Sequence, residues 1–398
     1  MPMISREELR VLSQFRFNEN ENCAVSFYFQ PTPPRNKSHR EETILAKDLV
    51  KNALRQVAAN GNDHCAKHDL EKILSLAEHL NGNQTRAKAV FAYGREGFWR
   101  EFDVPPNLPG TQLFINRRFH LKPMAAMLAV RPHLGILLLD RQRARLFDLR
   151  LDETKKEDSL KEQLDLFQPI FRRGKSDGYA GYDAGHTERR VADDVLHHFR
   201  TVASVLKERI EKGMWEQVIV GCQEKNWFDF EPQLHSYVRQ RVLGHFSMDV
   251  TSPSAEEIRE WAMNVLKEAQ ENQRKQLVKE VINHARGHRR GVTGLRRVLK
   301  AMQMGEVQTL IMSEKFHARA VECSSCGYIE SHMVKFCHAC GRSTLELEDV
   351  GDALIPMAIR RDIQLYLIKD NQELDNAGNI GALLRFRSER NQPMSFAS

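Results

Sequence analysis

Residues 171–200 read FRRGKSDGYAGYDAGHTERRVADDVLHHFR and raise the main question about this chain. A basic entry leads into a segment with four glycines, which gives way abruptly to a pattern typical of a helix. Glycine loses more conformational freedom on folding than any other residue, so such a segment is costly to order. Taken alone it predicts a mobile surface loop, and the rest of the chain has to explain why it stands directly before a helix.

The composition indicates a globular protein of two or three domains. The chain has 398 residues, of which 41% are hydrophobic and 28% are charged. The apolar run GILLL, at 135–139, is far too short to cross a bilayer, and the first residues predict an amphipathic helix instead of a signal peptide. We therefore expect a cytoplasmic protein without a membrane partner. The formal net charge of +6 permits a polyanionic partner without requiring one.

Four of the seven cysteines form two C-x-x-C turns within residues 321–342. Two such turns can bring four thiolates to one metal ion, and the spacing predicts one structural Zn²⁺ bound by Cys323, Cys326, Cys337 and Cys340. A glycine follows each turn, which lets the backbone bend sharply under the metal. Because four sulfur ligands leave no open position, we expect a structural role. A disulfide or redox role is the weaker alternative.

The other cysteines and the nearby histidines are not expected to bind the metal. Cys23, Cys65 and Cys222 are scattered along the chain, and each is expected to be a small buried apolar residue. His332 and His338 lie within the cysteine segment, where we expect them to be solvated or to support the ligands.

Hydrophobic periodicity predicts a mixed α/β (α+β) chain of three domains, 1–128, 129–272 and 273–398. The first domain is expected to hold an N-terminal helix, helices near 41–58 and 67–80, and strands at CAVSFYFQP, AKAVFAYG, GFWREFDVP and TQLFINRRFH. The second is expected to hold a β-hairpin turning at Asp140–Arg143, the glycine-rich loop 174–187, a helix near 188–212, a strand at WEQVIVGC and a helix at EPQLHSYVRQRVLGHF.

A long helix leads into the third domain. Ser254 and Glu257 at its start form the pattern of a capping box. After it we expect helix TGLRRVLKAMQMG, strand VQTLIMSE, a zinc ribbon at 321–342, helix EDVGDALIPMAIRRD, and strands IQLYLIK and IGALLRFR.

The stretch HARGHRRGVTGLRRVLK, residues 284–300, contains no acidic residue. It is either a solvated basic turn or a surface that contacts phosphates. Its cations are Arg286, Arg289, Arg290, Arg296, Arg297 and Lys300.

The third domain resembles the C-terminal domain of archaeal and eukaryotic peptide-chain release factors and their relative Pelota. The resemblance lies in GVTGLRRVLKAMQMGEVQTLIMSE, the cysteine ribbon, LEDVGDALIPMAIRRDIQLYLI and the closing GNIGALLRF. The family pattern has a Gly-Ala-Val, matched here by Gly305-Glu306-Val307, and a closing Gly-Gly-Ile-Gly-Ala motif, matched from Gly378 onward. The resemblance implies a three-domain release-factor-like architecture with the ribbon inserted in the third domain.

The second domain is similar to the family's middle domain, which presents a Gly-Gly-Gln tip at the start of a long helix. Here Ala184-Gly185-His186 stands in that place, and Thr187 is expected to start the helix. The glutamine is missing, so the tip either has lost peptidyl-tRNA hydrolysis and only occupies its site, or uses His186 to orient a water. The resemblance implies rRNA contacts by Arg172, Arg173, Lys175, Gly178, Gly181, Ala184, Gly185, His186, Arg189 and Arg190.

The first domain resembles the family less. Its RNKS loop keeps Asn36, Lys37 and Ser38 of the family's Asn-Ile-Lys-Ser codon-reading loop but lacks the isoleucine. In LFINRRF, residues 113–119, the family's tyrosine and cysteine are replaced, and only Phe119 remains. Stop-codon reading is therefore not expected, although these three residues remain candidates for contact with the decoding centre.

The two loops that carry the family's Gly-Gly-Gln and Asn-Ile-Lys-Ser motifs are altered here, whereas the C-terminal domain matches the family. This combination resembles the bacterial branch of the superfamily, which includes the ribosome hibernation factor Balon. The resemblance implies a monomer that mimics tRNA in the ribosomal A site, contacts rRNA of both subunits, and meets a translational GTPase such as elongation factor Tu. Occupation and protection of ribosomes is one expected function, and peptide release or rescue through residues 184–186 is the alternative. An RNA-binding protein of other purpose is a third.

Overall fold

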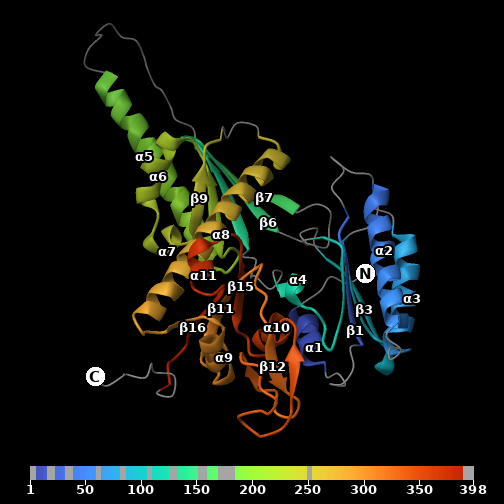
Figure 1. Cartoon of the computed structure of the whole chain (residues 1–398). Coiled ribbons are helices and arrows are strands. Elements are labelled where there is room, and N and C mark those ends of the chain that lie inside the picture. The colour runs from blue at the N-terminus through green and yellow to red at the C-terminus, as the bar shows by residue number, and fades with distance from the viewer. Residues whose placement is uncertain are drawn as a thin grey trace, which may run out of the picture. The chain divides into compact units, whose positions relative to one another are not determined.

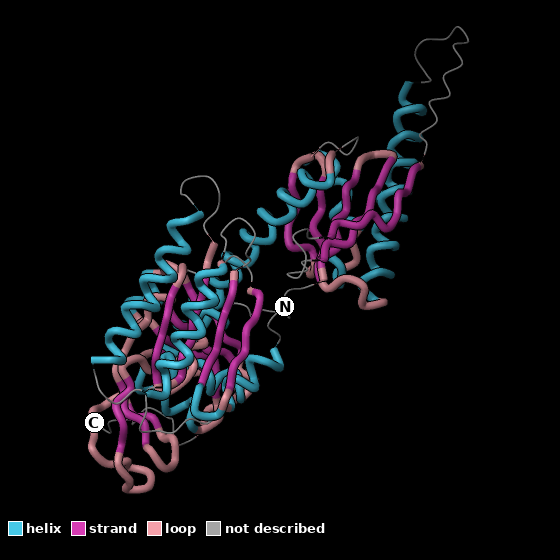
Figure 2. Tube along the Cα trace, turned by 90° about the vertical axis from the view of Figure 1, so that its right-hand side faces the viewer, coloured by secondary structure: helices cyan, strands magenta, loops and turns pink. Residues whose placement is uncertain are grey.

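The computed structural model describes residues 6–15, 23–31, 39–59, 64–80, 87–104, 110–125, 133–150, 159–168, 184–248 and 253–388. They form two compact units (Figures 1 and 2). The terminal unit joins residues 1–129 to residues 274–398, and the middle unit comprises residues 130–273. Within the described part of the chain, no helix is long and apolar enough to cross a membrane. The predicted division into three domains stays a prediction.

The N-terminal part of the terminal unit is an antiparallel sheet in the order β3-β2-β1-β4. Its central strand is buried on both faces, and side chains such as Val25 and Phe27 pack against α2 and α3. Both helices cover the same face of the sheet (Figure 1). The elements are α1 (Arg6–Gln14), β1 (Ala24–Phe29), α2 (His39–Ala59), α3 (His64–His79), β2 (Lys88–Tyr93), η1 (Gly94–Glu96), β3 (Phe98–Asp103), β4 (Gln112–Asn116) and α4 (Lys122–Ala125). The strands and helices predicted for this segment are confirmed.

One expectation about the cysteines here is wrong. Cys23, directly before β1, and Cys65, on α3, form a disulfide with their Cα atoms 5.8 Å apart. They are separated by 42 residues, and only the packing of α3 beside the sheet brings them together. Cys222 is buried and unpaired, as expected.

The C-terminal part of the terminal unit is a second sheet, in the order β10-β16-β11-β15. Strands β11 and β15 are parallel, and the other pairs are antiparallel. Its predicted elements are confirmed, whereas β10 and α11 were not predicted. The elements are α8 (Ala255–Arg286), β10 (Gly291–Thr293), α9 (Leu295–Gln303), β11 (Val307–Ser313), α10 (Gly351–Arg360), β15 (Gln364–Ile368), α11 (Gln372–Asn376) and β16 (Ile380–Leu384).

The capping box at the start of α8 is confirmed. The Glu257 carboxylate accepts a hydrogen bond from the Ser254 backbone N–H (2.9 Å), and the Ser254 hydroxyl accepts one from the Glu257 N–H (3.2 Å). Between β11 and α10 the chain forms a small separate sheet, the cysteine ribbon. Its strands are β12 (Ala320–Cys323), β13 (Ile329–Glu330) and β14 (Thr344–Leu347), in the order β13-β12-β14.

The two parts of the terminal unit share one hydrophobic core. Tyr28 and Phe91, on the sheet face away from α2 and α3, belong to the same cluster as Leu354 of α10, and α1 packs against α10. A partly buried polar junction joins the parts as well. His120 Nδ1 lies 2.6 Å from Asp352 Oδ1, and Asn116 Nδ2 donates to Asp352 Oδ2 at 3.0 Å. One carboxylate on α10 thus binds a group at the end of β4 and a group that follows this strand, so the way in which α10 packs against this segment is specified.

The middle unit is a five-stranded sheet in the order β7-β6-β5-β8-β9, with β5, β8 and β9 parallel. Helices α5, α6 and α7 cover one face, and the first half of α8 covers the other. In the buried strand β5, Leu137 packs on the side of α5, α6 and α7, and Ile136 packs on the side of α8. The elements are β5 (Leu134–Leu139), β6 (Arg143–Arg150), β7 (Ser159–Phe167), α5 (Ala184–Glu211), β8 (Gln217–Gly221), α6 (Glu224–Phe230), η3 (Glu231–Gln233), α7 (Ser236–Arg239) and β9 (Val242–Phe246).

Two predictions for the middle unit need correction. The helix expected over EPQLHSYVRQRVLGHF ends with α7, and VLGHF forms β9 instead. A Cβ atom at Gly244 would lie 2.9 Å from Val265 of α8, so glycine lets this strand approach the helix closely. Strand β7 was not predicted, and its acids pair with arginines of β6: Asp165 with Arg143, and Glu162 with Arg145.

Candidate functional site

Helix α5 projects beyond the core of its own unit (Figure 1). Its buried side chains, such as Val195, Phe199 and Val202, recur on one face from Val195 to Ile210. Before Val195, none of the described side chains is buried. At a rise of about 1.5 Å per residue, the segment from Ala184 to Val195 extends about 16 Å past the last buried contact. The helix therefore presents its N-terminus away from the sheet that anchors it.

The predicted tip residues Ala184, Gly185 and His186 form the first turn of α5. The helix was expected to start near 188, so this boundary needs correction. Alanine has the highest helix propensity and one glycine costs only about 1 kcal/mol, so the helix extends through both. Arg189 is exposed, whereas the side chains of residues 184–188 and 190 lie outside the described part.

Other predicted contact residues also lie outside the described residues. These are Arg172, Arg173, Lys175, Gly178 and Gly181 before α5, and Asn36, Lys37 and Ser38 before α2. Their roles stay predictions.

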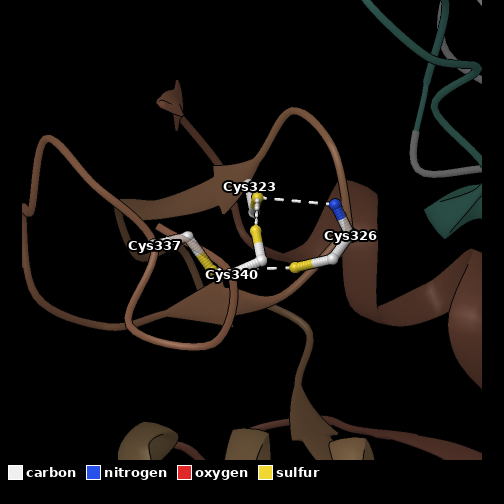
Figure 3. Close-up of side chains that lie close together, drawn as sticks. All are labelled: Cys323, Cys326, Cys337 and Cys340. Atoms are coloured by element: carbon white, nitrogen blue, oxygen red, sulfur yellow. Dashed lines mark hydrogen bonds between the residues drawn. The ribbon is translucent and has the colours of Figure 1, made fainter. Parts of the chain in front are cut away.

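The four ribbon cysteines converge on one point (Figure 3). Their Sγ atoms all lie within 4.8 Å of one another, with 3.3 Å between Cys323 and Cys340 and 3.6 Å between Cys326 and Cys337. A metal bound tetrahedrally at about 2.3 Å from each sulfur would space the sulfurs about 3.8 Å apart. The cluster therefore fits one metal ion, as the sequence predicted.

The backbone of the ribbon favours thiolate at the first turn. Backbone N–H groups of Cys326 and Ser325 donate to Cys323 Sγ, both at 3.4 Å. The hydrogen bond from Cys326 is the main cause that lowers the pKa of Cys323 from 9.0 to about 6. Gly327 and Gly341 adopt φ angles of 68° and 74°, which glycine tolerates without strain. Cys323 is thus the cysteine of the first turn that the backbone prepares for a cation.

The environment of the cluster contains residues that sequence patterns did not reveal. Gln303 of α9 donates to the Ile329 carbonyl at 2.5 Å, which joins the ribbon to the second sheet. Arg118, from the N-terminal part, pairs with Glu322 directly before the first cysteine. Only the fold brings these residues to the ribbon. His338 pairs with Glu330 at 3.0 Å and supports the ribbon without joining the cluster.

The arginines of the predicted basic patch are all exposed on the terminal unit. They are Arg286, Arg289, Arg290, Arg296 and Arg297.

The remaining cysteine, Cys222, is buried. Burial raises the pKa of its thiol to about 12, with a smaller contribution from Glu224, so this thiol is unreactive.

Comparisons with known proteins agree with the resemblance noted in the sequence. Residues 120–267 match the family model "Bacterial archaeo-eukaryotic release factor family 10". "Peptide chain release factor subunit 1" of Pyrococcus abyssi is 25% identical over 316 residues, which cover 71% of this chain and 74% of that protein. The Archaeoglobus fulgidus protein of the same name is 24% identical over 362 residues, 81% of this chain and 84% of that protein.

Among solved structures, Saccharomyces cerevisiae Dom34, described as a translation termination-like factor, is similar at 9% identity with a TM-score of 0.40. The similarity covers 99% of this chain and 96% of that one. The family model matches the unit that carries α5, and the release-factor relatives match well beyond it. Together, the family model and these relatives support a place for this chain in the bacterial branch of the archaeo-eukaryotic release factor and Pelota superfamily.

Proposed function

We propose that this protein is a ribosome-binding translation factor that enters the A site as a tRNA mimic and occupies or protects the ribosome. The observation that carries the proposal is helix α5, whose first turns extend about 16 Å beyond the last buried contact. A helix that projects in this way can carry a short tip into a narrow cavity while its own unit stays outside. The glycines that precede α5 allow backbone to pass close to phosphates and bases.

The distribution of charge in the middle unit supports this use of the tip. Arg143 and Arg145 on the sheet are each bound to a carboxylate. The arginines and lysine of the segment before α5, together with the exposed Arg189, are the cations assigned to rRNA. Such contacts recognise phosphate and shape, so ribosome affinity should fall steeply as salt increases.

Peptidyl-tRNA hydrolysis through the tip is the second candidate function. His186 takes the position of the family's glutamine and lies in the first turn of α5. Imidazole can donate and accept a hydrogen bond, which is the minimum needed to orient an attacking water. We favour occupation because hydrolysis depends on accurate placement of the attacking group, and the residue that places it in relatives is absent here. A role in ribosome hibernation is part of the same proposal, and it rests on the resemblance to the hibernation factor.

The metal proposed for the ribbon is one Zn²⁺. Four cysteine sulfurs at tetrahedral spacing form the ligand set that structural zinc prefers. When bound, the ion would hold the two turns of the ribbon together and supply no catalytic position. Mass spectrometry of the intact protein under non-denaturing conditions tests this, with one zinc per chain expected and iron or no metal as contradictory results.

The proposal extends to partners and location. The protein acts in the cytoplasm as a monomer, and its C-terminal domain meets a translational GTPase such as elongation factor Tu. Residues 36–38 lie near the decoding centre in this arrangement, and residues 184–186 lie near the peptidyl-transferase centre. These assignments follow the superfamily resemblance.

The test is co-sedimentation with bacterial ribosomes, either vacant or carrying peptidyl-tRNA, at two salt concentrations, with peptide release recorded in the same samples. We expect salt-sensitive binding without release above background. The triple variant R172Q/R173Q/K175Q should bind more weakly, whereas R239Q/R259Q, which removes two arginines already paired with acids, should not. Release that disappears in His186→Ala would favour the second function. Protein that stays in the supernatant throughout would contradict the proposal.

A further inference from the structure

A basic surface forms on the terminal unit where the turn after α8 lies beside the end of β16. Two hydrogen bonds to backbone carbonyls connect these segments. Leu384 N donates to the Arg290 carbonyl at 3.0 Å, and the Arg387 guanidinium donates to the Arg289 carbonyl at 2.8 Å. The basic surface comprises Arg286, Arg289, Arg290 and Arg387. The cations Arg296, Arg297 and Lys300 belong to α9, which packs on the opposite face of the second sheet from α8.

Three of these arginines carry charge that no described residue neutralises. The side chains of Arg286, Arg289 and Arg290 are exposed and form no ion pair or hydrogen bond with any part of the chain that the structure describes. The nearby carboxylate of Glu306 is buried and accepts hydrogen bonds from Ser388. The arginines of the β6–β7 ladder show the opposite arrangement, because each binds an acid.

Helix stability explains only one of the three. Arg286 lies in the last turn of α8, where a cation interacts favourably with the helix dipole. Arg289 and Arg290 follow the end of that helix, and neighbouring like charges repel one another. Their charges therefore add nothing to folding, which indicates that they serve an anionic partner.

An exposed aromatic side chain adjoins the arginines. Phe386 follows β16 between Arg385 and Arg387, and it is 55% exposed. An aromatic ring among cations is the combination that binds unpaired nucleic acid, because the ring stacks on a base while the cations contact phosphates. A protein segment composed only of acidic residues would use the arginines but would offer no ring to stack on Phe386.

We propose that the basic surface binds a single-stranded segment of RNA, with its arginines on phosphates and Phe386 against an unpaired base. The guanidinium group suits this role because its planar fork matches phosphate oxygens. The inference goes beyond the proposed function, since none of these residues belongs to the unit that carries α5. It holds whether or not the tip of α5 enters a ribosome.

The test measures binding of the full-length protein to a labelled oligouridine of about 12 nucleotides by fluorescence anisotropy. The double variant R289Q/R290Q should bind at least about tenfold more weakly. Loss of two phosphate contacts should also flatten the slope of log K against log salt by about 1.4. The control variant R239Q/R259Q, with the same change in net charge, should retain the dissociation constant of the unaltered protein. Equal binding by R289Q/R290Q and the unaltered protein would overturn the proposal.

Two further probes separate RNA from other anions. Phe386→Ala should weaken binding to the oligouridine at least about fivefold and leave binding to duplex RNA unchanged. Polyglutamate of matched charge should compete poorly. Oligouridine binding that Phe386→Ala leaves intact would overturn base stacking. Equal competition by polyglutamate would overturn RNA as the partner and assign the surface to an acidic protein segment. The triple variant R172Q/R173Q/K175Q should bind the oligouridine normally, which keeps this result distinct from ribosome binding.

Discussion

Two buried histidines, one in each compact unit, have different surroundings. In the terminal unit, His120 is 8% exposed, binds Asp352 at 2.6 Å and stacks on Phe114 with ring centroids 3.8 Å apart. In the middle unit, His198 of α5 is 2% exposed, and its Nε2 has no hydrogen-bond partner in the described part of the chain. Burial lowers the pKa of His198, and a hydrogen bond with the Arg143 backbone only partly opposes this.

The difference shows what each unit requires of its polar groups. In the terminal unit the buried histidine and its carboxylate come from segments more than 200 residues apart, so their hydrogen bond fixes how these segments pack. In the middle unit, the anchored part of α5 is held mainly by apolar contacts, and the buried imidazole, which forms a hydrogen bond with the Arg143 backbone, must stay neutral. Polar pairing therefore adds specificity to the packing of the terminal unit, whereas the shape of an apolar face specifies the packing of α5.

Metal removal should have the largest effect, and it should affect the terminal unit but not the middle unit. Structural zinc contributes on the order of 10 kcal/mol of apparent free energy to small metal domains. Treatment with a strong chelator should therefore abolish hydrogen-exchange protection in residues 320–347 and leave the middle unit unchanged. Addition of zinc should restore protection. Protection in the ribbon that is the same before and after chelation would contradict a metal-held ribbon.

Asp352→Ala tests the polar junction next. Removal of the carboxylate leaves the buried His120 and the half-buried Asn116 without their partner, so the free energy of unfolding should fall by about 3 kcal/mol. Urea denaturation followed by hydrogen exchange in the terminal unit measures this. Asp352→Asn keeps the shape and part of the hydrogen bonding, and should lose less. A loss confined to the middle unit would refute the comparison.

Acid should act on the middle unit through His198. Because the folded-state pKa lies below the ordinary value of 6.5, the unfolded chain binds the proton more readily. The stability due to neutral His198 is complete above pH 6.5 and is lost as the pH falls toward the folded-state value. The urea midpoint of the middle unit should decrease between pH 7.5 and 5.5, and His198→Phe should decrease less over that range. Identical slopes for the two proteins would exclude His198 as the cause.

The smallest effect is expected at the exposed ladder of β6 and β7. Arg145 forms two hydrogen bonds with Glu162, at 2.8 and 2.9 Å, but the Glu162 side chain is 39% exposed. Arg145→Gln should therefore lower the free energy of unfolding by no more than about 1 kcal/mol, and less in high salt. Thermal melts at two salt concentrations measure it. A loss as large as that of Asp352→Ala would show that burial does not govern these pairs.

Helices and strands were predicted correctly where the spacing of apolar residues along the sequence matched the faces that are buried in the fold. Strand β5 and helix α8 follow directly from an apolar run and from a capping box with an apolar face. The four-cysteine cluster was predictable because ligand spacing is itself a local pattern. Strand β9 was mistaken for helix because VLGHF is short. Only its pairing with β8 and the close approach of Val265 to Gly244 identify it as a strand.

Long-range partners could not be predicted from sequence. The Cys23–Cys65 disulfide, the Asp352 junction and the Arg118–Glu322 pair each join segments whose proximity is set by tertiary packing. The tip was located by resemblance, but the start of α5 at Ala184 was not, because helix boundaries depend on propensities that differ by only fractions of a kcal/mol.

Whether α5 carries its tip into the ribosome can be seen directly by electron cryo-microscopy of the full chain on vacant bacterial ribosomes. We expect the first turn of α5, at residues 184–186, in the peptidyl-transferase centre, with the N-terminal segment toward the decoding centre. Density for the chain elsewhere on the ribosome, or α5 pointing into solvent, would contradict it.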